Sequence, residues 1–203
     1  MKKDLDLVKI CSYLFFDGHL YKDLKCFYFS SKEVKNLKDF EKLVKNKFKI
    51  KGRYYYNDGG AGRTKTHKYR VFSRKICTEL QKLGVPKGSK TTTKFLIPSW
   101  ILRKKQFAKE FIKIAYFCEG SMKENRKNPR IRININKSEE LLINGLNFMS
   151  QLKKILRENG IRTTDIGVYS AKTRKDGVKV KELRFRILTE DSNTFINKIG
   201  WLK

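Results

Sequence analysis

Apolar residues recur along this chain with two periods, and the local period predicts a helix or a strand. A spacing of three to four residues predicts helices over residues 5–17 and 73–83. Between those two helices, Ser30 and Glu33 have the spacing of a capping box, which predicts the start of another helix. The buried face of that helix would carry four apolar residues at helical spacing, namely Leu37, Phe40, Val44 and Phe48.

Alternation of apolar and polar residues predicts short strands between these helices. Residues 19–30 are expected to form a hairpin. Residues 51–57 and 64–72 are expected to form two strands on either side of the turn NDGGAG. The first half of the chain is therefore predicted to run helix, strand, strand, helix, strand, strand, helix.

The second half of the chain is expected to repeat this order, which indicates an internal duplication. Its helices are predicted over residues 99–118, 138–158 and about 190–199. Its strands are predicted over residues 130–136, 162–171 and 178–188, the last two around a Lys-Asp-Gly turn. In the connector LGVPKGSKTTTKFLIPSW, Gly84 and Pro86 stop one helix and Pro98 precedes the next. We expect two domains, 1–97 and 98–203.

The charge of the chain points to a polyanionic partner. Lys and Arg number 48 against 20 Asp and Glu, so the net charge is +28, which favours binding to nucleic acid or to an anionic membrane surface. No apolar run approaches the ~20 residues of a membrane span, and MKKDLDLVK lacks a signal-peptide core. We therefore expect a soluble, cytoplasmic protein. Its cysteines form no C-x-x-C pair, so reduced and largely buried thiols are expected at Cys11, Cys26, Cys77 and Cys118.

One motif occurs at the same place in both halves. An apolar helix is followed by an acid and a glycine in ICSYLFFDG, residues 10–18, and again in IKIAYFCEG, residues 112–120. A single acid at a helix end is most often a solvated side chain. Two of them, each opening a matching half of a basic protein, favour a shared function for Asp17 and Glu119.

These two motifs resemble the motif of the LAGLIDADG homing endonucleases in their single-chain form. The continuations DGHL and EGSM, together with LGVPKGSK and IPSWI, are also similar to that family. The resemblance implies an α+β fold of two pseudo-symmetric αββαββα halves, whose antiparallel sheets form a DNA-binding saddle. Without a splicing nucleophile at its first residue or a His-Asn at its end, the chain is expected to be a free-standing protein rather than an intein.

The chain departs from the family motif at two kinds of position. Where the family has a glycine that lets the two motif helices pack closely, this chain has Ser12 and Ile114. Ile114 is expected to push the helices apart or to move their contact toward Ala115. The sixth motif position, often acidic in the family, is Phe15 and Phe117.

The resemblance implies that Asp17 and Glu119 are catalytic and bind divalent metal, with Gly18 and Gly120 completing the metal site. The expected ion is Mg²⁺ or Mn²⁺, because carboxylate-held divalent ions activate water and neutralise charge during phosphodiester hydrolysis. A carboxylate at a helix C-terminus is opposed by the helix dipole, and a bound cation would offset that repulsion.

The predicted strands pair an apolar face with a basic face. Such a sheet suits the DNA major groove, where Arg and Lys reach guanine, Asn reaches adenine, and other cations bind phosphate. A solvated face would usually mix charges of both signs. The residues predicted to bind DNA are Lys51, Arg53, Lys68, Arg70, Arg130, Arg132, Asn134, Arg184 and Arg186.

Three functions remain open from the sequence. The first is a Mg²⁺-dependent, site-specific double-stranded DNA endonuclease that recognises a long asymmetric site as a monomer and leaves short 3′ overhangs, as the resemblance implies. The second keeps the fold without cleavage, as a degenerate DNA-binding protein, a transcriptional regulator or an intron RNA maturase. The third is a basic RNA-binding or ribosome-associated protein, which explains the charge but not the duplicated motif.

Overall fold

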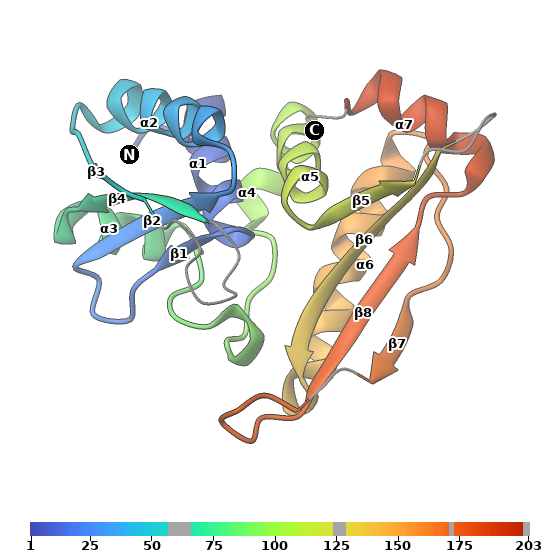
Figure 1. Cartoon of the computed structure of the whole chain (residues 1–203). Helices are drawn as coiled ribbons and strands as arrows, with labels where there is room; N and C mark the ends of the chain where they lie inside the picture. Colours follow the sequence, from blue (N-terminus) through green and yellow to red (C-terminus); the bar gives the residue numbers. More distant parts are fainter. Residues whose placement is uncertain (57–65, 124–128, 171–172, 201–203) are drawn as a thin grey trace. The chain divides into compact units, whose positions relative to one another are not determined.

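The structure, a computed structural model, describes residues 1–56, 66–123, 129–170 and 173–200 (Figure 1). The chain forms two compact units, Met1–Gly88 and Ser89–Lys203. The domain division after residue 97 expected from the sequence stays a prediction. Within the described residues, no helix has the length and apolar content that a membrane crossing requires.

The first unit alternates helices with pairs of strands, as the sequence predicts. Its elements are α1 (Leu5–Phe15), β1 (Gly18–Leu20), β2 (Cys26–Ser31), α2 (Val34–Phe48), β3 (Arg53–Tyr55), β4 (His67–Phe72) and α3 (Arg74–Lys82). The strands form one antiparallel sheet in the order β1-β2-β4-β3. Helix α2 packs on β2 and β4, and Leu37, Phe40 and Val44 on its inner face are fully buried.

The second unit repeats this arrangement after two short helices, η1 (Lys90–Thr92) and α4 (Ser99–Leu102). Its antiparallel sheet has the corresponding order β5-β6-β8-β7, and Figure 1 shows α6 lying along β6 and β8. The predicted α+β class with two duplicated halves is confirmed. The remaining elements are α5 (Lys105–Glu119), β5 (Gly120–Lys123), β6 (Arg130–Ser138), η2 (Glu139–Leu141), α6 (Leu142–Glu158), β7 (Gly167–Ser170), β8 (Val180–Arg186), η3 (Thr189–Asp191) and α7 (Ser192–Lys198).

The predicted capping box of α2 is wrong. Ser30 lies within β2, and its Oγ donates a hydrogen bond to the backbone oxygen of Asp17 at 2.8 Å. The Oγ of Ser31 accepts instead from the backbone N–H of Glu33 at 3.1 Å. Strand pairing extends one residue further than expected, so Ser30 is unavailable as a cap.

The single helix predicted over residues 99–118 is two helices, α4 and α5. Lys104 has an extended backbone (φ −114°, ψ 114°) and separates them. No glycine or proline in RKKQ signals this break, so tertiary packing overrides the local helical preference there. Conversely, β5 was not predicted, although its place after the second acid-glycine motif matches that of β1.

The predicted strands of residues 51–57, 64–72 and 162–171 are shorter in the structure. The turn NDGGAG, which begins with Asn57, lies outside the described residues. Helix α3 ends at Lys82 before the predicted stop, and Gly84 adopts φ +97°. All four cysteines are free thiols; three are buried and Cys118 is half-buried, as expected.

Lys137, which follows the basic part of β6, holds the connector onto the second unit. Its fully buried ammonium donates to the backbone oxygens of Lys90 at 2.8 Å and Thr93 at 2.6 Å. The ammonium also lies 3.7 Å from the centroid of the Phe95 ring. Burial lowers the pKa of Lys137 from 10.5 to about 8. The segment before α4 is therefore part of the second unit's folded core.

Candidate nucleic-acid interface

The two motif acids occupy equivalent positions in the two units, each directly before the glycine that begins a strand. Asp17 is exposed and lies two residues beyond the end of α1. Glu119 is half-buried and is the last residue of α5. Because both carboxylates lie at helix C-termini, the helix dipole is unfavourable to each of them, and a cation would offset this cost.

Close backbone packing explains the glycine that follows each acid. A Cβ at Gly18 would lie 2.8 Å from the backbone oxygen of Tyr28 and 2.9 Å from the Cα of Leu14. A Cβ at Gly120 would clash with the backbone oxygen of Tyr116. In each unit, glycine therefore lets the backbone pass directly from the helix into the first strand, which fixes the position of the acid. The predicted role of both glycines in a metal site stays a prediction.

The chemistry of the two acids fits a hard divalent cation. Mg²⁺ and Mn²⁺ accept carboxylate oxygens, and Mg²⁺ sites that act on phosphates commonly use one or two carboxylates, with water and substrate oxygens completing the shell. Each unit supplies one such carboxylate. Among the described residues, no group of three or more His, Cys, Asp and Glu side chains could hold a metal by itself. A single carboxylate in each unit fits an ion whose remaining ligands are water and phosphate oxygens of a substrate.

In the second unit, the predicted DNA-binding residues share the outer face of the sheet. Ile131, Ile133 and Phe185 are buried beneath it, so the alternation predicted from the sequence is confirmed. Register places Arg132 opposite Arg186 and Asn134 opposite Arg184. Glu182 lies on this same face and pairs with Arg184 at 3.7 Å, so the charge of the face is predominantly but not wholly positive.

Two arginines lie directly opposite each other in each sheet. These pairs are Arg132 with Arg186 in the second unit and Arg53 with Arg70 in the first. Like charges directly opposite on neighbouring strands destabilise a sheet. An anion bound over the pair would remove this cost, and a nucleic-acid backbone supplies such anions.

A small hollow lies on the outer face of the second sheet beside the arginine pair. Its volume is about 160 Å³, and Ser121, Lys123, Arg130, Arg132 and Arg186 line it. Within it, Arg132 Nε donates to Ser121 Oγ at 2.7 Å, which fixes the guanidinium. Four cations around a pocket of this size suit a phosphate group. Ser121 and Lys123 were missed from the sequence because β5 was not predicted.

The outer face of the first sheet combines the predicted cations with aromatic rings. Lys68 and Arg70 on β4 and Arg53 on β3 share this face. Lys51 precedes β3 and is exposed. The rings, which sequence reasoning did not assign to the site, belong to Tyr21, Tyr28, Tyr55 and Phe72.

Arg70 is held among these rings. Its guanidinium carbon lies 4.7 Å from the ring centroid of Tyr55 and 5.5 Å from that of Tyr21. Its Nε is buried and has no hydrogen-bond partner within the described part of the chain. Burial also raises the pKa of the neighbouring Tyr28, so its hydroxyl stays protonated. The guanidinium is thus fixed in place before any ligand binds.

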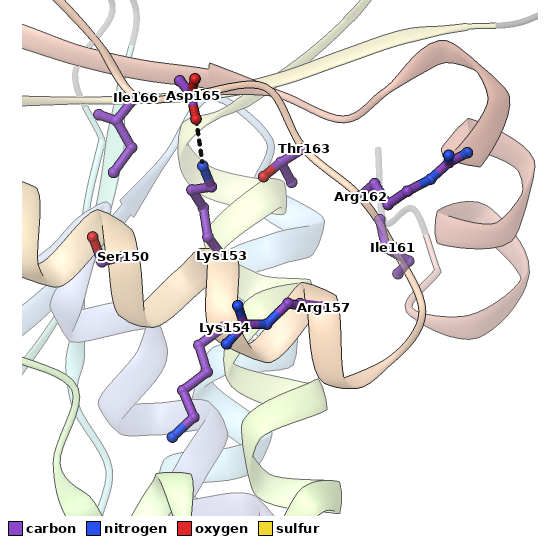
Figure 2. Close-up of a pocket in the computed structure, with 9 residues that line it drawn as sticks. All are labelled: Ser150, Lys153, Lys154, Arg157, Ile161, Arg162, Thr163, Asp165 and Ile166. Carbon is purple, nitrogen blue, oxygen red and sulfur yellow. Dashed lines mark ion pairs between the residues drawn. The ribbon is translucent and has the colours of Figure 1, made fainter.

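A larger hollow lies elsewhere, between α6 and the segment that precedes β7 (Figure 2). Its volume is about 640 Å³, and its cations do not converge on one point. Lys153 pairs with Asp165 at 3.6 Å, and Arg162 points away from them (Figure 2). Arg162 pairs instead with Asp191 at 2.9 Å. Because these cations already have carboxylate partners, this hollow is a weaker candidate site than the sheet faces.

Comparison with solved structures defines the class of fold. The chain has the LAGLIDADG fold. The homing endonuclease I-DmoI, in a complex with DNA and Mn, aligns over 97% of this chain and 99% of its own, with 16% identity and a TM-score of 0.57. The N-terminal LAGLIDADG domain of DUF199/WhiA aligns over 99% of this chain and 84% of its own, with 14% identity and a TM-score of 0.59.

Comparison with curated proteins gives matches to parts of longer chains. The tRNA-splicing ligase RtcB of Pyrococcus abyssi is 35% identical over 144 residues, which is 69% of this chain and 15% of that protein. RtcB of Methanopyrus kandleri is 30% identical over 96% of this chain and 20% of its own length. The RNA polymerase subunit Rpo1N of Methanocaldococcus jannaschii is 29% identical over 68% of this chain and 10% of its own length. This chain thus spans a fifth or less of these relatives. No family model matches it.

Proposed function

We propose that this protein is a site-specific endonuclease that hydrolyses phosphodiester bonds of double-stranded DNA with Mg²⁺ or Mn²⁺. The observation that carries the proposal is the repeated acid at the helix-to-strand junction of two units with the same topology. Each of these units also presents a basic sheet face. A protein that only binds a polyanion has no evident need for an acid at both positions.

Asp17 and Glu119 are the proposed metal ligands, and each serves the cleavage of one strand. The bound ion would supply charge neutralisation at the phosphate and an activated water. The packing of Gly18 and Gly120 keeps each carboxylate at its junction. The likeness to I-DmoI in complex with DNA and Mn supports a divalent ion and a DNA substrate.

The sheet faces are proposed to bind the DNA on either side of the cleavage position. Arginines fixed by Ser121 or by aromatic rings lose little freedom on binding, so they suit base-edge or phosphate contacts. The two faces carry different residues, which supports a long asymmetric target bound by one monomer.

The activities named for the curated relatives are not proposed for this chain. A region similar to it occurs in tRNA-splicing ligases and in an RNA polymerase subunit. Because these named activities differ, similarity to a fifth or less of each protein supports neither of them here.

A second candidate function is DNA binding without cleavage, as in a transcriptional regulator. One observation favours it: the motif position that is often acidic is Phe15 in the first unit and Phe117 in the second, so each motif supplies one acid. Phe15 is also buried, with only 2% of its surface exposed.

Selection from a randomised duplex library separates these functions. The library is bound in Ca²⁺, and the retained duplexes are then transferred to Mg²⁺ and sequenced. We expect a defined duplex to be enriched and to be cut only after the transfer. Enrichment without cutting in either Mg²⁺ or Mn²⁺ would favour the second candidate. In a gel shift, tighter binding of a structured RNA than of the enriched duplex would contradict both.

A further inference from the structure

The two sheet faces differ in chemistry, although they occupy equivalent places in duplicated units. The outer face of the second sheet carries arginine, asparagine and serine at its centre. The outer face of the first sheet carries a cluster of rings among its cations. We call His19, Tyr21, Tyr28, Tyr55 and Phe72 the aromatic row.

The rings at the centre of the aromatic row pack against one another instead of lying open. His19 and Tyr28 are opposite residues on neighbouring strands, and their rings are stacked at 5.4 Å with an interplanar angle of 24°. The ammonium of Lys68 lies 4.8 Å from the centroid of the Tyr28 ring. Rings whose faces are occupied in this way present their edges outward, so they are poor platforms for stacking of unpaired bases.

Phe72 is the member of the row that exposes the most apolar surface. Half of it, 50%, is accessible, and the guanidinium carbons of Arg53 and Arg70 lie 5.9 Å and 6.0 Å from its ring centroid. Tyr55 is 39% exposed. On a face that binds nucleic acid, Arg53 and Arg70 could contact phosphates or purine edges, and Phe72 between them could make an apolar contact.

In the major groove the apolar group available for such a contact is the C5-methyl of thymine, which cytosine and uracil lack. We propose that the aromatic row reads thymine methyl groups, with Phe72 as the principal contact, so that the half-site bound by the first unit depends on thymine at defined positions. In the described part of the chain, the corresponding face of the second unit carries a single exposed ring, Tyr169, under the guanidinium of Arg184, and its other outward residues on β6 and β8 are polar or charged. We infer that it reads its half-site mainly through hydrogen bonds to purine edges. This inference rests on the proposed recognition of duplex DNA.

The test replaces thymine by deoxyuridine, which removes the methyl group and keeps every base-pair hydrogen bond. Each half of the selected duplex is substituted separately, and affinity is measured by fluorescence anisotropy in Ca²⁺. We expect one half to be sensitive, with affinity about 4-fold weaker for each contacted methyl removed. The other half should change little.

Variants test whether the aromatic row causes this sensitivity to loss of the thymine methyl group. Phe72→Ala should weaken binding to the thymine duplex and abolish the difference between thymine and uracil. Phe72→Leu, which keeps an apolar side chain, should restore most of that difference. Tyr169→Ala removes an aromatic of similar exposure, 47%, from the second sheet and should leave the uracil effect unchanged.

Three results with the uracil-substituted duplexes would overturn the inference. They are equal uracil effects in both halves, no uracil effect in either half, or a uracil effect that persists in Phe72→Ala. Tighter binding of single-stranded oligo(dT) than of the duplex, lost in Phe72→Ala, would show stacking and would also overturn it. Failure to enrich any duplex would instead contradict the proposed function itself.

Discussion

Asp17, Glu119 and the glycines that follow them show how a short motif controls the position of a functional group. The sequence identifies the acids because they recur in matching contexts. It does not show why glycine follows. At Gly18 the reason is the backbone oxygen of Tyr28, which the folded sheet brings close, and at Gly120 it is that of Tyr116 in the last turn of α5. The acid and the glycine therefore have separate roles, in chemistry and in packing.

Lys137 gives a prediction about pH. Its pKa is about 8 in the folded protein against 10.5 ordinarily, so between these values the unfolded chain binds more protons. The contribution of Lys137 to the free energy of unfolding should therefore be lowest below pH 8 and should rise as the pH increases toward 10.5. Urea unfolding of the wild type and of Lys137→Met between pH 7 and 10.5 measures this directly.

The free energy of unfolding of the wild type should rise relative to that of Lys137→Met across this window. The general relief of repulsion in a strongly basic chain affects both proteins equally and cancels in the difference. Parallel pH curves for the two proteins would contradict the account of Lys137.

At the level of elements, the strand β6 is well predicted because its side chains alternate between the buried core and the outer face of the sheet. The sequence predicted one helix over residues 99–118 where the structure has two, because no local signal marks the extended backbone of Lys104. The prediction also missed β5, because a strand of four residues has too short an alternating pattern to be recognised. The aromatic row was missed for a related reason. In CFYFS and KYRVF, rings that face outward adjoin rings and aliphatic residues that face the core, and only the register distinguishes them.

The opposed arginines give a prediction at the element scale. Arg186→Thr removes one member of the pair with Arg132, so the free energy of unfolding should rise at low salt by about 0.2–1 kcal/mol. Duplex affinity should fall. Arg162→Thr is the matched control, because it breaks the ion pair with Asp191 and should lower stability without affecting DNA binding. Urea unfolding and anisotropy measure the two quantities. A loss of stability in Arg186→Thr would contradict the proposed repulsion.

At the level of the whole molecule, the net charge of +28 should make DNA binding strongly dependent on salt. We expect the logarithm of the association constant to fall linearly with the logarithm of salt concentration, by roughly 0.9 for each phosphate neutralised. Substituting one of the cations that line the small hollow, Lys123→Ala, should reduce this slope by about 0.9 if that residue binds a phosphate. A nearly flat salt dependence would contradict the assignment of the sheet faces.

The fold and its duplication could be predicted from the sequence because helix and strand periods repeat in the same order in both halves. Whether the two acids cooperate in cleavage is a property of the whole protein bound to DNA. Glu158 provides a matched control for them, because it is also a glutamate at the end of a helix, near a glycine but outside the motif.

The most direct test is strand cleavage of the selected duplex in Mg²⁺ by the double variant Asp17→Asn/Glu119→Gln and by Glu158→Gln. Protein is supplied at concentrations that saturate binding in each case. The double variant should bind the duplex but cut neither strand, whereas Glu158→Gln should cut both strands as the wild type does. Cutting by the double variant at the wild-type rate would contradict the assignment of Asp17 and Glu119 as the metal ligands of an endonuclease.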